Sequence, residues 1–122
     1  MNNYVLTEVV CLFLWLTTKI LPLATPTPKT ARLYFGVLGA QGREVELSPH
    51  PISREFPYIS SGSKMEMGGK TFSTDFQLKN AVPEVEAFRL LKEIYNFFGY
   101  SDDKIPYVDR KSLPHKIDSK KF

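Results

Sequence analysis

The stretch YVLTEVVCLFLWLTTKILPLA, residues 4–24, decides how the fold of this chain is interpreted. Its only charged residues are Glu8 and Lys19. A helix of about 21 residues is about 30 Å long, which matches the hydrocarbon thickness of a bilayer. Only ten uncharged residues separate Glu8 from Lys19, however, and so short a run is also typical of a signal peptide or a buried helix. The stretch therefore predicts a helix in one of three environments.

A cleaved signal peptide fits both ends of this stretch poorly. Signal peptides begin with basic residues, but residues 1–8 contain none and include Glu8. Small residues normally occupy the first and third positions before the cut, whereas a cut after Ala24 would place Pro22 in the third position. We therefore expect the segment to be retained.

The polar residues of the predicted helix gather on one stripe. With about 100° per residue, positions eleven apart return to nearly the same angle. The stripe consists of Tyr4, Thr7, Glu8, Cys11, Trp15 and Thr18. The opposite arc is apolar over about two thirds of the circumference, which is wider than the buried face of a typical soluble helix. We expect a single membrane span in residues 1–24, with lipid around the arc and another membrane protein against the stripe.

Basic residues predict the orientation of this span. No Lys or Arg precedes it, whereas Lys19, Lys29 and Arg32 follow closely. Since loops rich in Lys and Arg stay on the positive side of a membrane, we expect the C-terminal part of the chain on that matrix-like side.

The segments after the helix predict a small α+β part. Residues 25–30, TPTPKT, are a spacer, because alternating prolines fix φ and exclude helix. Residues 31–40 form an apolar run too short for a second span, and its period fits a strand or a helical turn. Residues 64–67 and 70–73 flank a Gly-Gly pair, which is a hairpin signal.

Residues 83–98, PEVEAFRLLKEIYNFF, predict an amphipathic helix. The proline suits a first helical position, and Gly99 is a helix stop. The apolar face consists of Val85, Phe88, Leu91, Ile94, Tyr95 and Phe98. Packing in a core is the simplest role for this face. So much aromatic surface in a small fold also suits an interface with a partner.

Residues 101–122 contain two prolines and no sustained apolar period. We expect an extended tail, either disordered or ordered across a partner through Tyr107, Leu113 and Phe122. The predicted fold is thus mixed and mostly irregular. It has a transmembrane helix in residues 1–24, the spacer in 25–30, the α+β segment with one hairpin and one amphipathic helix in 31–100, and the tail in 101–122.

The sequence contains no recognisable set of catalytic residues. His50 and His115 are isolated, and Cys11 lies in the apolar helix. The glycines of residues 36–42 match neither the dinucleotide-binding nor the phosphate-loop pattern. A net charge of +3 is too small and too evenly spread to predict nucleic-acid binding. We expect no catalytic residue, metal, cofactor or small-molecule substrate.

The expected function is that of a non-catalytic, single-span accessory subunit that stabilises a large membrane protein complex. The expected partners are the other subunits and membrane lipid. Because the sequence lacks a secretory signal, a cysteine pair and an Asn-x-Ser/Thr acceptor, we expect the mitochondrial inner membrane, in a respiratory-chain or ATP synthase assembly. The alternative is a small soluble α+β binding or regulatory module in which residues 9–16 form a buried core helix.

Overall fold

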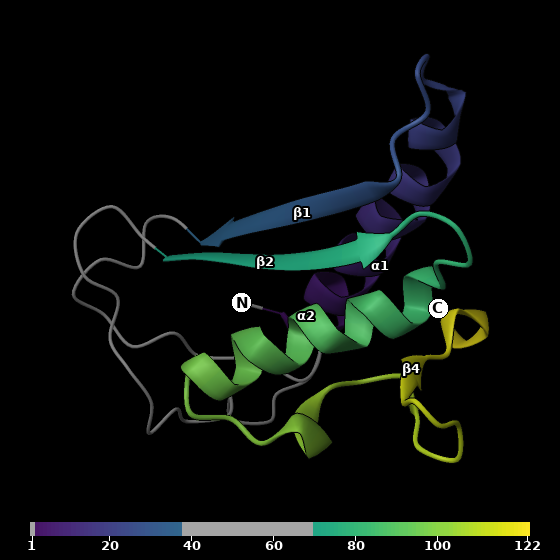
Figure 1. Cartoon of the computed structure of the whole chain (residues 1–122). Coiled ribbons are helices and arrows are strands. Elements are labelled where there is room, and N and C mark those ends of the chain that lie inside the picture. Colours follow the sequence, from purple (N-terminus) through teal and green to yellow (C-terminus); the bar gives the residue numbers. More distant parts are fainter. Residues whose placement is uncertain (1, 38–69) are drawn as a thin grey trace.

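The computed structural model describes residues 2–37 and 70–122, and these form a small mixed α+β fold (Figure 1). The larger elements are α1 (Asn3–Ile20), β1 (Thr30–Val37), β2 (Lys70–Gln77) and α2 (Pro83–Phe97). The smaller ones are the 3-10 turns η1 (Leu21–Leu23), η2 (Asp102–Lys104) and η3 (Ser119–Lys121) and the two-residue strands β3 (Val108–Asp109) and β4 (Lys116–Ile117).

The helix α1 begins at an asparagine cap. Asn2 Oδ1 accepts a hydrogen bond of 2.9 Å from the Val5 amide, which satisfies one of the free donors of the first turn. Inside the helix, the hydroxyls of Thr7 and Thr17 donate to carbonyl oxygens four residues earlier, both at 2.8 Å. These polar side chains thus use the backbone of α1 itself as their partner.

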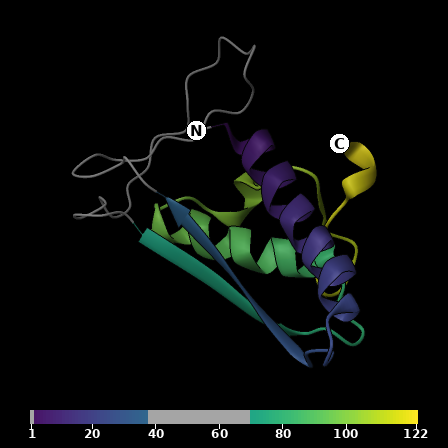
Figure 2. The same ribbon diagram turned by 90° about the horizontal axis from the view of Figure 1, so that it is seen from above.

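The helix α2 is the centre of the fold. It begins at Pro83 and is followed by Gly99, whose φ of 80° allows the chain to turn, as the sequence predicted. It lies between α1 and the strand pair, and β4 packs against it as well (Figures 1 and 2). Residues on several sides of α2 are therefore at most 1% exposed, among them Ala87, Leu90, Leu91, Ile94 and Tyr95.

The strands β1 and β2 pair antiparallel, with Phe35 opposite Phe72 and Arg32 opposite Asp75. Alternation places Phe72, Thr74 and Phe76 in the buried layer, while Arg32 and Asp75 form a salt bridge on the exposed face. The apolar run of residues 31–40 thus begins as a strand. Of the predicted hairpin, residues 64–67 lie outside the described residues, and residues 70–73 belong to β2, whose described partner is β1.

The tail of residues 101–122 corrects the expectation of an extended segment. It folds back on the domain through η2, the β3–β4 pair and η3. Ile105 and Ile117 enter the core, and the Asp118 amide donates a 2.6 Å hydrogen bond to the Tyr107 carbonyl. Two isolated isoleucines leave no periodic pattern, and this packing could therefore not be predicted from the sequence.

Candidate functional site

The helix α1 carries two apolar faces, and the fold covers only one. Leu6, Val10 and Leu14 of the inner face are 5% exposed or less. The outer face is defined by large side chains that are 46% to 57% exposed, namely Val5, Leu12, Phe13, Trp15 and Ile20. These five residues spread over about 160° of the helix circumference. A folded chain seldom leaves so many large apolar side chains contiguous and half exposed, so the outer face is the candidate site.

The predicted polar stripe of α1 mostly faces this chain itself. Thr7 and Cys11 are buried, so neither reaches another protein in this fold. Tyr4 and Glu8 are half-buried under the tail: the rings of Tyr4 and Tyr107 meet edge to face at 5.2 Å, and the Tyr107 hydroxyl donates to Glu8 Oε1 at 3.2 Å. The expectation of a partner protein at the stripe is corrected, because the tail and α2 of the same chain are its neighbours.

Trp15 and Thr18 complete the stripe toward the end of α1. The half-buried Thr18 donates its hydroxyl to the Trp15 carbonyl at 2.8 Å. The Trp15 ring is exposed, and Lys19 Nζ lies 5.7 Å from its centre, within range of a cation–π contact. Trp15 is thus the one large stripe side chain that also belongs to the outer face.

The candidate interface on α2 lies inside the molecule. Phe88, Leu91, Ile94, Tyr95 and Phe98 are buried, and Val85 is half-buried. Of the two roles left open by the sequence, the structure places this face in the core. The interface assignment is therefore corrected, because α1, β2 and β4 pack against α2 and cover its aromatic surface.

The three predicted tail anchors have different surroundings. Tyr107 lies between Tyr4 and Phe122, and its ring centre is 5.1 Å from that of Phe122. Burial and the hydrogen bond to Glu8 raise the pKa of the Tyr107 phenol. Leu113 is 88% exposed and Phe122 about half exposed. Tyr107 thus anchors the tail to α1 of the same chain, which corrects its assignment to a partner.

A buried carboxylate joins the strand pair to α2. Glu86 accepts a 3.2 Å hydrogen bond from the Thr74 hydroxyl and a 2.9 Å ion-pair contact from Arg89 Nη1. On the exposed face of the sheet, the hydrogen bonds from Arg32 hold the pKa of the Asp75 carboxyl below its usual value. Both ion pairs, Glu86 with Arg89 within α2 and Asp75 with Arg32 between β1 and β2, are part of the fold, and neither lies at the outer face of α1.

The described residues contain no group of three or more His, Cys, Asp or Glu side chains that could hold a metal ion. His115 packs edge to face on Phe88 at 5.7 Å, and its Nδ1 lies 3.0 Å from the Ser112 carbonyl oxygen. His50 lies outside the described residues. The sequence expectations about catalysis and metals therefore stay predictions.

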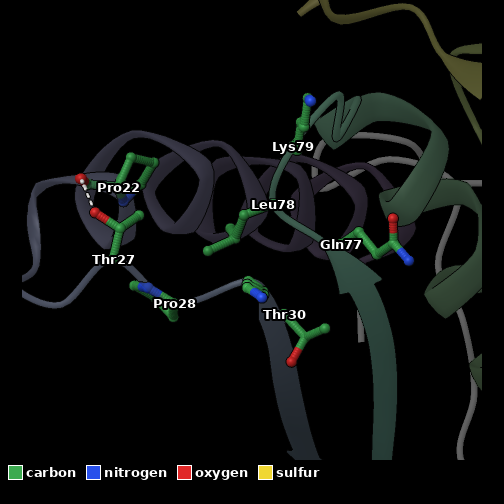
Figure 3. Close-up of a pocket in the computed structure, with 8 residues that line it drawn as sticks. Pro22, Thr27, Pro28, Thr30, Gln77, Leu78 and Lys79 are labelled. Atoms are coloured by element: carbon green, nitrogen blue, oxygen red, sulfur yellow. Dashed lines mark hydrogen bonds between the residues drawn. The ribbon is translucent and has the colours of Figure 1, made fainter.

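A second exposed feature lies where α1 ends. We call it the tip, and it consists of residues 19–29 together with Leu78 and Lys79. In Figure 1 the end of α1 and the turn after it project beyond the strand pair. A hollow of about 610 Å³ opens there between the turn and the end of β2 (Figure 3). Its lining combines Pro22, Pro28 and Leu78 with Lys29 and Lys79.

Comparison of the chain with protein-family models, curated proteins and solved structures found no match. The two exposed features of α1, its outer face and the tip, are therefore interpreted from their chemistry alone.

Proposed function

We propose that the protein is a non-catalytic, membrane-associated accessory subunit that helps to stabilise a larger membrane protein complex. The observation that carries this proposal is the outer face of α1, where large apolar side chains remain exposed on a helix whose other face is already in the core. Such a surface is unfavourable in water, and its burial would contribute about 25 cal/mol per Å².

The composition of α1 supports a lipid environment for this face. The segment Asn3–Leu23 is long and apolar enough to cross a membrane, and only 28% of its apolar 18-residue stretch is buried within the fold. The hydroxyls of Thr17 and Thr18 donate to carbonyls of the same helix, so this part of α1 demands few hydrogen bonds from water. Low demand for water is the condition for placing a helix face among acyl chains.

The packing of α1 on α2 restricts how the folded chain meets the membrane. Lys92 and Glu93 of α2 are exposed on the side that does not pack in the core. A complete crossing by α1 in this packed state would draw such charges toward the hydrocarbon, at a cost of about 2.5 kcal/mol or more each. The proposal is therefore surface attachment, with the outer face of α1 lying in the lipid interface. The single span predicted from the sequence would require α1 to separate from α2.

The soluble binding module is the second candidate, and one observation favours it. Val10, Cys11 and Leu14 are buried, as expected if residues 9–16 form a core helix. Leu12 and Phe13 of the same segment are 53% exposed, however. One face of this segment thus packs in the core. The membrane-associated role explains why the opposite face is apolar and exposed.

The size of the native assembly tests the proposed function. A tagged chain in its native cells should sediment with membranes and fractionate with a mitochondrial inner-membrane marker, with its C-terminal part on the matrix-like side. After solubilisation in mild detergent, it should elute in an assembly many times its own 14.0 kDa. Recovery in the soluble fraction as a free monomer would favour the binding module and contradict the proposal.

A further inference from the structure

The tip is a basic, exposed segment at the end of α1. Lys19, Lys29 and Lys79 are all exposed, and the tip contains no Asp or Glu. The absence of acids extends along the sequence, because no acidic residue occurs between Glu8 and Glu44. Within the described ranges, none of these three lysines takes part in a salt bridge. Their charges are thus available to an anionic surface.

Apolar side chains of the tip lie among these lysines. Leu23 is 80% exposed and Ile20 is 57% exposed, and Trp15 stands one turn before Lys19. Exposed leucines beside lysines and a tryptophan are typical of segments that enter the region between headgroups and acyl chains. Lys19 also lies in the last turn of α1, where it offsets the negative end of the helix dipole.

The hollow at the tip has the same mixed chemistry. In Figure 3 the Leu78 side chain points toward the space between the turn after α1 and the start of β1, whereas the Lys79 side chain points away from it. An apolar floor with lysines at its margin suits an acyl chain below a phosphate. The hollow, the exposed Leu23 and the three lysines all lie at one end of the molecule, next to the outer face of α1.

We infer that the tip contacts anionic lipid headgroups, with Lys19, Lys29 and Lys79 against the phosphates and Leu23 among the upper acyl chains. The inference rests on the proposed membrane association and specifies the lipid. In the orientation that follows, both the tip and the adjoining outer face of α1 face the lipid. Most of the strand pair remains on the water side, whereas Phe122 at the end of the tail lines one hollow with Leu12 and Trp15 and so lies beside the outer face.

The test uses the purified full chain and flotation with vesicles of neutral phosphatidylcholine, with or without about one third phosphatidylserine. A lysine near an anionic surface contributes about 1 kcal/mol, or about fivefold in binding. The triple variant K19Q/K29Q/K79Q should thus bind the anionic vesicles on the order of 100-fold more weakly than the unmodified chain. Raising the salt from about 0.05 M to about 0.5 M should weaken binding of the unmodified chain, because the charges lie in water.

A matched triple variant, K92Q/K104Q/K111Q, removes the same charge from exposed positions outside both the tip and the outer face of α1 and should retain most of the binding. Equal loss in both variants, or equal binding of the unmodified chain to neutral and anionic vesicles, would overturn the inference and leave the membrane association intact. Failure of the unmodified chain to float with either kind of vesicle would overturn both the inference and the membrane association.

Discussion

Leu14→Ala should lower the free energy of unfolding by roughly 2–5 kcal/mol, the range for a leucine truncated in a close-packed core. Leu14 is fully buried on the inner face of α1. Since a domain of this size has only about 5–15 kcal/mol of stability in total, the loss should be plain in urea unfolding followed by circular dichroism. The result would show that α1 is an integral part of the fold.

Leu12→Ala is the matched control for this experiment. It makes the same chemical change two residues earlier in the same helix, but Leu12 is 53% exposed on the outer face. The expected loss is less than about 1 kcal/mol, because surface substitutions rarely cost more. Equal losses at the two positions would contradict the division of α1 into an inner and an outer face.

The double variant Leu12→Ser, Phe13→Ser should abolish most membrane association while the fold stays intact. Burying one such side chain contributes about 1.5–3 kcal/mol when it goes from full exposure to complete burial. Both side chains begin half exposed, so we expect a combined loss of about 2 kcal/mol, or about 30-fold in partitioning. The measurement is flotation with membranes from the native cells, with circular dichroism to verify folding.

The control for the double variant removes apolar surface elsewhere. Tyr34 on β1 is 62% exposed and Leu113 in the tail is 88% exposed. The pair Tyr34→Ser, Leu113→Ser should leave flotation unchanged, because these side chains lie away from the outer face of α1. If the control pair lost as much flotation as the double variant, association would depend on total apolar surface, and α1 would have no special role.

Local signals allowed the two helices to be predicted from the sequence, whereas residues 31–40 were compatible with either a strand or a helical turn. The helix predicted for residues 83–98 is observed as Pro83–Phe97. Proline fixes a helical φ at the first position, and a glycine after the end adopts the positive φ that terminates a helix. The apolar run after the spacer forms β1 because β2 pairs with it. Its alternation of half-buried and exposed residues is visible once a partner strand is present.

Long-range packing could not be predicted in the same way. The Gly-Gly pair suggested residues 64–67 as a local partner for residues 70–73, and these lie outside the described residues. The described partner of β2 is β1, from far earlier in the chain, and no local signal indicated it. The stripe on α1 was predicted to pack against a neighbour, and Thr7 and Cys11 are buried against the rest of this chain. A sequence pattern shows that a face has a neighbour, and it does not show whether that neighbour belongs to the same chain.

The most direct test of the central claim is the depth of a spin label at position 12 on vesicles. In a Cys11→Ala background, a label on Leu12→Cys should become accessible to oxygen and inaccessible to a water-soluble nickel complex when anionic vesicles are added. A label on Leu113→Cys should remain accessible to the nickel complex. If the label at position 12 stayed as accessible to the nickel complex as the label at position 113, the outer face of α1 would be in water and the account would be wrong.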